Sequence, residues 1–254
     1  MAITIKSERE IELMAEAGKI LERVHNELEK ALHPGMSTKD IDTLGEKIIR
    51  SYGCIPSFLN YNGYPASICV SVNQEVVHGI PDKHRIIHEG DIVSLDAGLI
   101  YEGYHSDAAR THAVGEVSEE AKKLIQVTKE SFFEGIKFAK AGNHLFDISG
   151  AIGRYAEERG YGVVRDLCGH GIGTALHEAP EIPNYEVGRK GVRLRPGMTL
   201  AIEPMINIGT HEVDWLDDDW TVVTRDGSLS AHYENTILIT EGEPRILSLT
   251  CDNE

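Results

Sequence analysis

The stretch IVSLDAGLIYEGYHSDAART, residues 92–111, decides which fold we expect. Its apolar beginning ends at Asp96, a Tyr-Glu-Gly turn follows at residues 101–103, and a second acid, Asp107, lies eleven residues after the first. Because the midpoint between the two acids falls inside the turn, we predict a hairpin in which Asp96 and Asp107 face each other. Side chains opposed in this way have Cβ atoms about 4.5–5.5 Å apart, which suits two carboxylates that share a cation.

Helical patterns lie on both sides of this hairpin in the chain. Ser7 and Glu10 have the spacing of a capping box, so a helix begins there. Apolar residues then recur at helical spacing until a His-Pro-Gly stop at residues 33–35. The same kind of pattern predicts four helices, over about 7–32, 38–53, 118–140 and 148–160.

The second half of the chain repeats landmarks of the first at an offset of 107 residues. This offset sets Gly35 on Gly142 and Asp96 on Glu203. We interpret the repeat as an ancient duplication. The predicted fold is α+β, with two halves packed about a pseudo-twofold axis and helices outside a curved, mainly antiparallel sheet. The expected boundaries are 1–254 for a single domain, and about 1–112 and 113–254 for its repeats.

Two further acids lie at strand ends in the second half. Glu203 ends the apolar run 198–202, and Glu234 comes just before 236–239, a run that we expect to pair with 221–223. A single acid at a strand end is usually an ordinary surface residue. Converging carboxylates are different, because two like charges about 4 Å apart repel by roughly 1 kcal/mol in water and by about 4 kcal/mol at an effective dielectric constant near 20. Four converging carboxylates contain six such pairs. Their total repulsion would rival a domain's stability of about 5–15 kcal/mol, so protons or cations must neutralise the acids.

His170 lies in the motif CGHGIG, residues 168–173, and offers a nitrogen ligand to add to the four acids. A lone histidine is more often an ordinary packed or surface residue, so this interpretation depends on the acids. The glycines on either side would let the backbone approach a site closely. The residues alone therefore favour a site for divalent cations.

The composition argues against several classes of function. Asp and Glu outnumber Lys and Arg by 41 to 25, for a formal charge of −16, and a nucleic-acid surface needs clustered basic residues. No apolar run approaches the roughly 18 residues of a membrane span, and no secretory segment follows the N-terminus. Four widely spaced cysteines favour reduced thiols and a cytoplasmic protein. They are Cys54, Cys69, Cys168 and Cys251.

Six motifs together resemble the type I methionine aminopeptidases, which have the pita-bread fold. They are VHGIP at 77–81, SLDAG at 94–98, HSDAART at 105–111, CGHGIG at 168–173, AIEP at 201–204 and HYENT at 232–236. The resemblance covers nearly the whole chain and implies five ligands to two divalent ions, which would be Co, Mn, Fe(II) or Zn. In this family pattern Asp107 and Glu234 would bridge the ions, Asp96 would complete one site, and His170 with Glu203 the other.

The reaction that the resemblance implies is hydrolysis of the first peptide bond by a metal-activated water. Glu203 would also shuttle the proton, His177 would donate a hydrogen bond to the oxyanion, and His78 would contact the amide beyond the scissile bond. The methionine side chain would lie in an apolar, polarizable cavity. Its walls would be Tyr61, Tyr64, Cys69 and Trp220. Two positions depart from residues common in the family, Phe58 and Leu176.

The implied partners are the N-termini of nascent polypeptides at the ribosome, whose initiator methionine is removed when the second residue is small and uncharged. No nucleic acid and no membrane is expected, and the chain would act as a monomer. Two other interpretations stay open. A proline-specific peptidase of the same fold has a similar ligand set, although such chains usually carry a large extra N-terminal domain. A peptide-binding relative without catalysis would typically have lost ligands, and here all five are present.

Overall fold

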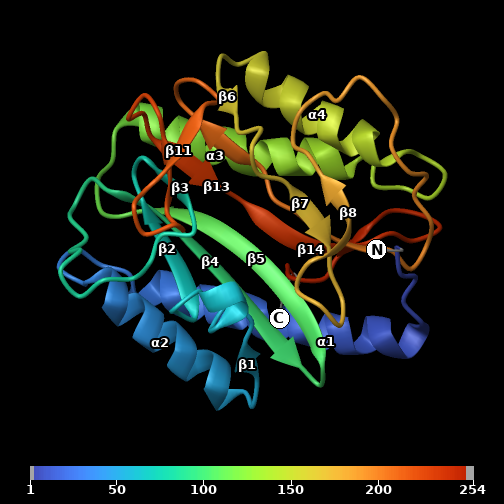
Figure 1. The fold of residues 1–254 in the computed structure, drawn as a ribbon, viewed down its shortest axis with the longest axis horizontal. Helices are drawn as coiled ribbons and strands as arrows, with labels where there is room; N and C mark the ends of the chain where they lie inside the picture. The colour runs from blue at the N-terminus through green and yellow to red at the C-terminus, as the bar shows by residue number, and fades with distance from the viewer. Residues whose placement is uncertain (1–2, 250–254) are drawn as a thin grey trace.

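A nine-stranded sheet crosses the middle of the molecule in this computed structural model, which describes residues 3–249 (Figure 1). Its main path runs through β1 (Ile55–Pro56), β4 (Ile92–Tyr101), β5 (Tyr104–Ala113), β14 (Glu234–Leu238), β9 (Thr199–Ile202), β7 (Gly169–Gly171) and β8 (Glu178–Ile182). Beside this path, β2 (Ile68–Val72) pairs with β4, and β15 (Arg245–Ile246) with β14. All these pairings are antiparallel, as predicted.

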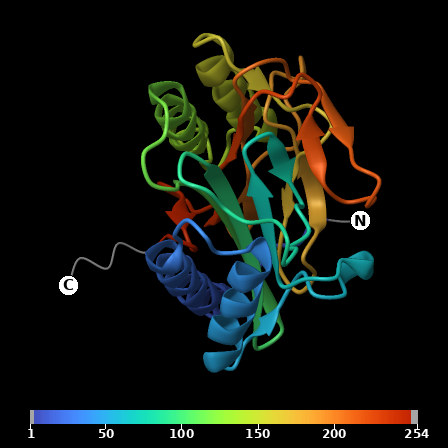
Figure 2. The same cartoon turned by 90° about the vertical axis from the view of Figure 1, so that its left-hand side faces the viewer.

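Two pairs of helices cover one face of this sheet (Figure 2). The first pair, α1 (Glu8–Ala31) and α2 (Thr38–Ser51), packs on β2, β4 and β5, and the second, α3 (Glu119–Ile136) and α4 (Leu145–Glu157), packs on β9 and β14. The predicted start of α1 is confirmed, because Ser7 and Glu10 form the reciprocal hydrogen bonds of a capping box. The side chain of Ser118 likewise caps α3. The α+β, pita-bread expectation is confirmed.

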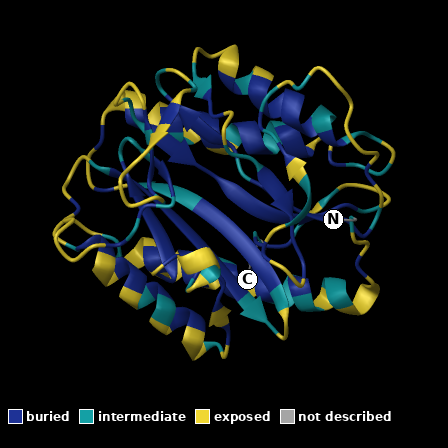
Figure 3. Ribbon diagram, in the orientation of Figure 1, coloured by how far each residue is buried: buried dark blue, intermediate teal, exposed yellow. Residues whose placement is uncertain are grey.

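Alternation along the strands separates the two faces of the sheet. On β4, Leu95 and Ala97 pack in the core beneath α1 and α2, so Asp96 between them points to the other face. On β5, Ala108 belongs to the same helix-covered core, and Asp107 therefore also points away from the helices. Figure 3 shows most of the main sheet buried, although its edge strand β8 is partly exposed, and the exposed residues concentrated in loops and on the outer sides of the helices. The acids thus lie on the face that the helices leave uncovered.

The two halves share part of their construction. The offset of 107 residues carries the start of α2 at Thr38 to the start of α4 at Leu145, and the start of β4 at Ile92 to the start of β9 at Thr199. Beyond these elements the halves differ. β4 turns directly into its partner β5, whereas β9 is separated from its partner β14 by several other strands.

The β4–β5 hairpin forms, but its register is not the predicted one. Asp96 pairs with Ala109, two residues beyond Asp107, so the acids are diagonal neighbours on one face. The turn contains only Glu102 and Gly103, with φ of 46° and 88°, which is the left-handed geometry of a two-residue hairpin turn. The prediction of direct opposition was wrong because the turn is centred between Glu102 and Gly103, one residue beyond the midpoint of the two acids, and this shifts the register by two residues.

Two three-stranded sheets stand beside the main sheet. One contains β6 (Gly162–Val163), β10 (Met205–Asn207) and β13 (Ser230–His232); the other contains β3 (Glu75–Val77), β12 (Val222–Thr224) and β11 (Val213–Trp215). The predicted pairing of 221–223 with 236–239 was wrong, since β12 pairs with β11 and β3, while β14 pairs with β5, β9 and β15. Sequence proximity favoured a hairpin there, but both segments have partners from distant parts of the chain.

Three of the four cysteines, Cys54, Cys69 and Cys168, are free thiols, and Cys251 lies outside the described residues. Among the helices of residues 3–249, none is both long enough and apolar enough to cross a lipid bilayer.

Candidate metal centre and substrate cavity

The predicted metal ligands lie in two adjacent rows across the uncovered face of the sheet. In the first row, Asp96 on β4 pairs with Ala109 on β5, which pairs with Glu234 on β14. Glu203 directly follows β9, and the register of β9 with β14 continues it into the same row. Long-range strand pairing therefore aligns three carboxylates that are far apart in the chain.

The second row contains Asp107 on β5 and His170 on β7. His170 pairs with Ala201 on β9. Between β5 and β14, the Thr236 hydroxyl accepts a hydrogen bond from the Asp107 N–H at 3.0 Å and donates one to the Asp107 carbonyl oxygen at 2.9 Å. A side chain thus bridges the two strands at the point where their backbone ladder ends.

Close packing of the neighbouring strands explains the glycines on both sides of His170. A Cβ atom on Gly169 would lie 2.4 Å from the carbonyl oxygen of Ala201, and one on Gly171 would lie 2.2 Å from that of Ala179. The sequence predicted that these glycines let the backbone approach a site; the structure shows that they let β9 and β8 approach β7. His170 Nδ1 lies 2.9 Å from the Gly171 carbonyl oxygen, which can only accept, so Nδ1 carries the proton and Nε2 keeps its lone pair.

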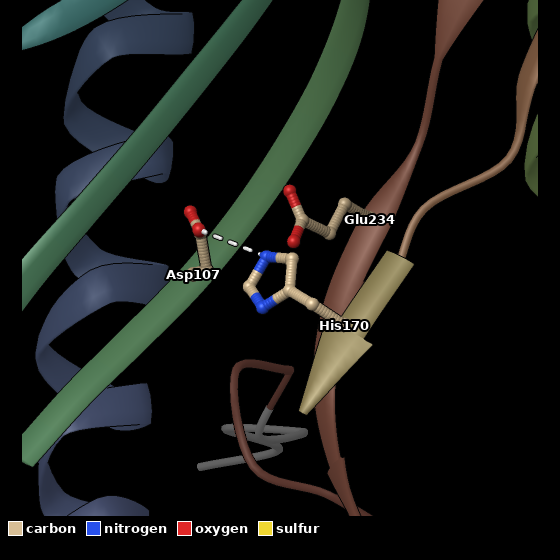
Figure 4. Close-up of side chains that lie close together, drawn as sticks. All are labelled: Asp107, His170 and Glu234. Atoms are coloured by element: carbon tan, nitrogen blue, oxygen red, sulfur yellow. Dashed lines mark ion pairs between the residues drawn. The ribbon is translucent and has the colours of Figure 1, made fainter. Parts of the chain in front are cut away.

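The side chains of Asp107, His170 and Glu234 converge from three strands (Figure 4). One ligand atom of each lies within 4.8 Å of the others. His170 Nε2 is 3.9 Å from Asp107 Oδ2 and 3.6 Å from Glu203 Oε1. Asp96 is close enough for the charges of Asp107 and Glu203 to raise its pKa. All five predicted ligands therefore belong to one group, although Asp96 and Glu203 lie outside the tightest set of three.

All four carboxyl groups have a raised pKa. Burial is the largest cause for each of them, and the charge of Asp107 adds to it for Asp96, Glu203 and Glu234. Burial raises the pKa of Asp107 to about 7. One oxygen each of Asp96, Asp107 and Glu234 is buried without a hydrogen-bond partner among the described residues. Such acids are costly to bury unless cations or protons neutralise them.

The donor set fits divalent cations. Burial lowers the pKa of His170 to about 3, so its ring is neutral and its Nε2 lone pair can bind a metal. Buried carboxylates with unpartnered oxygens supply the remaining ligand atoms. One imidazole among carboxylates is compatible with Mn, Fe(II), Co or Zn.

A cavity of about 130 Å³ adjoins these rows, and every residue predicted to contact substrate lines it. Those residues are His78, His177, Tyr61, Tyr64, Cys69 and Trp220. Phe58 and Leu176, the two departures from the family pattern, line it as well. The Phe58 ring fits because residue 98 is glycine: a Cβ atom on Gly98 would lie 2.8 Å from a carbon of that ring. The predicted ligands line the same cavity, so the structure brings both sets together.

Two histidines that are not predicted ligands stand in the cavity wall. The His177 ring meets that of His170 edge-on at 4.2 Å between centroids, and His177 Nδ1 is 2.8 Å from the Tyr61 hydroxyl. His78 follows β3 with φ of 60°, a left-handed conformation that residues other than glycine adopt rarely, and often at functional sites. Burial lowers the pKa of His78 to about 4 and also lowers that of His177, so both rings are neutral near pH 7.

Tyr64, Cys69 and Trp220 form an apolar wall. The Tyr64 hydroxyl donates to the Gly79 carbonyl oxygen at 2.9 Å, and the Tyr64 ring meets Trp220 edge-on at 5.1 Å. Burial raises the pKa of Cys69 well above its usual value, so the thiol stays protonated and apolar in character. Asp218 accepts a hydrogen bond from the backbone N–H of Trp220 at 2.9 Å and thereby helps to position that residue.

Two residues at the site were missed by the sequence analysis. His232 Nε2 lies 4.0 Å from Glu203 Oε2, and both His232 ring nitrogens are buried without a hydrogen-bond partner among residues 3–249. The available signal was its place in the HYENT motif, two residues before Glu234. Asn62 lines the cavity from a short 3-10 turn, η1 (Tyr61–Gly63), with φ of 49°. Its signal was the Asn-Gly pair, which favours left-handed turns.

Comparisons with known proteins agree with one another. Residues 12–241 match the model of metallopeptidase family M24. A methionine aminopeptidase from Clostridium acetobutylicum is 58% identical over 247 residues, which cover 97% of this chain and 99% of that relative. The crystal structure of a methionine aminopeptidase from Thermotoga maritima has a TM-score of 0.96 at 47% identity, with 98% of this chain and 100% of that chain covered.

A proline-specific enzyme with the same fold is more distant. The Xaa-Pro dipeptidase from Bacillus anthracis has a TM-score of 0.78 at 27% identity, and the match covers 97% of this chain but 62% of that one. The dipeptidase therefore contains the fold of this chain together with a further part that this chain does not match. Taken together, the family match, the high identity over full length and the structural likeness show that the chain belongs to metallopeptidase family M24 and, within it, to the methionine aminopeptidases.

Proposed function

We propose that the chain is a metal-dependent aminopeptidase that removes the N-terminal methionine from newly made polypeptides, preferentially when the second residue is small and uncharged. The observation that carries this proposal is the convergence of four buried carboxyl groups and the His170 lone pair beside an apolar cavity. The repulsion among the acids supports cation binding, and the cavity supports recognition of one apolar side chain.

Asp96, Asp107, His170, Glu203 and Glu234 would hold two divalent ions, drawn from Mn, Fe(II), Co and Zn. When bound, such ions supply a water of lowered pKa and polarise a carbonyl group. Asp107 and Glu234 lie between the other ligands, one in each row, which supports a shared role for them. Anomalous scattering at the metal edges, from protein purified without added metal, would identify the ions.

Three further side chains would handle protons and the substrate. The Glu203 carboxylate lies between His170 and His232, and burial together with the charge of Asp107 raises its pKa, which suits a group that accepts and releases a proton. His177, neutral and anchored by Tyr61, would donate a hydrogen bond to the developing oxyanion. His78, held in a left-handed conformation on the same cavity, would contact the amide beyond the scissile bond.

The methionine side chain would lie against the aromatic and sulfur-containing wall. Thioethers gain about 0.3–1.5 kcal/mol from contact with aromatic rings, and Tyr64, Trp220 and Phe58 supply such rings here. Phe58 occupies space left by Gly98, and Leu176 is shorter than the aromatic residue usual there. The cavity of about 130 Å³ suits a single side chain, which fits an enzyme that removes one residue at a time.

The substrates of such an enzyme are the N-termini of nascent chains, which places its work in the cytoplasm. Association with the ribosome and a monomeric state stay predictions from the sequence.

The decisive experiment compares the release of methionine from Met-Ala-Ser with cleavage of Xaa-Pro peptides, after loading the protein with each candidate metal. We expect methionine release that depends on metal and little cleavage before proline. Faster cleavage of Xaa-Pro peptides would favour the proline-specific alternative. No methionine release with any divalent metal would overturn the proposal and revive a non-catalytic, peptide-binding role.

A further inference from the structure

A groove of about 610 Å³ continues from the substrate cavity across the edge of the main sheet. The two spaces share His170 and His177. Glu181 on β8 pairs with His170 on β7, so its side chain lies on the same face as the metal ligands. Phe146 and Arg189 also line the groove. Its volume falls within the roughly 300–1,000 Å³ typical of ligand sites.

We propose that this groove binds the part of the polypeptide that follows the scissile bond, and that Glu181 makes it favour basic residues there. The inference rests on the proposed function. The cavity of about 130 Å³ can take the methionine side chain but not the chain behind it. The groove begins at His177, the ring assigned to the scissile carbonyl, so it lies where the remaining polypeptide must emerge.

The charges in the groove support a preference of this sign. Glu181 is exposed and has no ion pair among the described residues, whereas Glu178, the other acid in this segment that lines the groove, is paired with Lys6 at 2.6 Å. Arg189 lies over the Phe146 ring, 5.4 Å from its centroid, also without a carboxylate partner within residues 3–249. The unpaired charge that the strand register sets beside a predicted metal ligand is therefore negative, whereas Arg189 lines the groove from the loop between β8 and β9.

An alternative route would pass Trp220, which lines the cavity but not the groove; three residues before it in the chain, the exposed Asp217 also has no ion pair in the described part of the chain. This alternative offers a matched control. Both acids are exposed and unpaired, and only Glu181 lies in the groove.

The test measures kcat/KM for three hexapeptide amides that begin Met-Ala and carry Lys-Lys, Ser-Ser or Glu-Glu at positions three and four. For each protein the values are normalised to its own rate on Met-Ala-Ser. We expect the Lys peptide to exceed the Glu peptide by about two- to fivefold at low salt, the range of exposed ion pairs. Glu181→Gln should remove the preference and Glu181→Lys should reverse it, while Asp217→Asn should leave it unchanged.

Calorimetric binding of the product peptides, without the terminal methionine, should show the same order and the same dependence on Glu181. Equal kcat/KM values for the Lys and Glu peptides, with Met-Ala-Ser still cleaved, would overturn the proposed role of the groove but not the proposed function. If Asp217→Asn removed the preference for the Lys peptide and Glu181→Gln did not, the polypeptide would not leave through the groove. Failure to cleave Met-Ala-Ser with any metal would remove the proposed function, and this inference with it.

Discussion

Charged side chains lie on both faces of β4, β5 and β14, and the two faces satisfy them differently. On the helix-covered face, the Arg110 guanidinium donates to the carbonyl oxygens of Ala109, Glu234 and Ser248 and to the side-chain oxygen of Asn235. It also lies over the Tyr233 ring, 4.6 Å from the centroid. On the cavity face, each of three acids has a buried oxygen without a partner in the described residues. They are Asp96, Asp107 and Glu234.

The difference separates a structural charge from a functional one within three neighbouring strands. Arg110 is partnered by its own chain, so its role is complete in the folded protein. The carboxylates need a partner from outside, because burial and mutual repulsion both oppose their charged forms. Arg110 and Asp107 are three residues apart in the sequence, and strand alternation alone assigns them to opposite faces.

The sharpest way to break this comparison is to remove a charge from the cavity face. Asp107→Asn should lower methionine release by more than the 10–100-fold typical of residues that only support a metal ligand. Metal content, measured on the purified protein, should fall with it. The metal-free variant should be as stable as the parent or more stable, because one repelling charge is gone. Normal turnover with normal metal content would contradict the assignment of Asp107.

The matching change on the other face should act on stability instead. Arg110→Met removes four hydrogen bonds donated by a charged group, so we expect the free energy of unfolding to fall by about 3–5 kcal/mol. Lys129→Met is the control, since Lys129 is exposed and its ammonium lies 6.0 Å from the same Tyr233 ring. That change should stay within about 0.5 kcal/mol. Equal losses from the two variants, in denaturant titrations, would show that Arg110 is not specially partnered.

A pair of histidines sharpens the same distinction. His177→Ala on the cavity face should lower kcat by about 10²–10³-fold with metal content unchanged, because it removes a donor to the oxyanion. His25→Leu is the counterpart on the helix face, where Nε2 of the buried ring donates to the Ala108 carbonyl oxygen at 2.8 Å. We expect it to cost about 1–3 kcal/mol of stability and to leave kcat of the folded protein unchanged. Unaltered turnover in His177→Ala would refute its role.

The smallest expected effect is a pH dependence of the metal-free protein. The folded pKa of Asp107 is raised to about 7 from a usual value of 3.8, so between these values the folded state binds more protons than the unfolded state. The stability that Asp107 contributes is therefore greatest at low pH and is lost as pH rises towards 7, whereas histidines of lowered pKa, such as His78 and His170, act in the opposite sense below about pH 6.5. The Tm of the parent protein minus that of Asp107→Asn, followed from pH 5 to pH 8, should therefore fall by several degrees, since 1 kcal/mol is worth about 2–4 °C for a chain of this size.

Added metal should flatten that slope. A difference in Tm that stays constant or rises over the same interval in metal-free protein would contradict a raised pKa for Asp107.

Local signals in the sequence predicted the helices well. Ser7 with Glu10 marks the start of α1 because a capping box satisfies backbone donors within four residues of chain. The hairpin was predicted correctly in kind but not in register, because the difference depends on left-handed backbone at Glu102 and Gly103. Pairing between distant strands could not be predicted in this way, and β12 was assigned the wrong partner.

In the candidate site, too, local features could be predicted from the sequence and contacts between distant strands could not. The acids could be picked out at the ends of apolar runs, and family motifs supplied the histidines. Their convergence depends on β5, β14, β9 and β7 lying side by side, which no local pattern encodes. His232 was missed for this reason, since its approach to Glu203 follows from the placement of β13.

The pairing of β5 with β14, which joins the two halves of the chain, affects how long the protein lasts in a cell. β5 and β14 are joined by the backbone pairs Glu234–Ala109 and Asn235–Ala108, and a cation held by acids from both strands would add a non-covalent crosslink there. At a free ion concentration of 100 times the dissociation constant, such binding adds about 2.7 kcal/mol to the folded state. We therefore expect metal supply to govern how long the chain survives cellular proteases, as well as how fast it works.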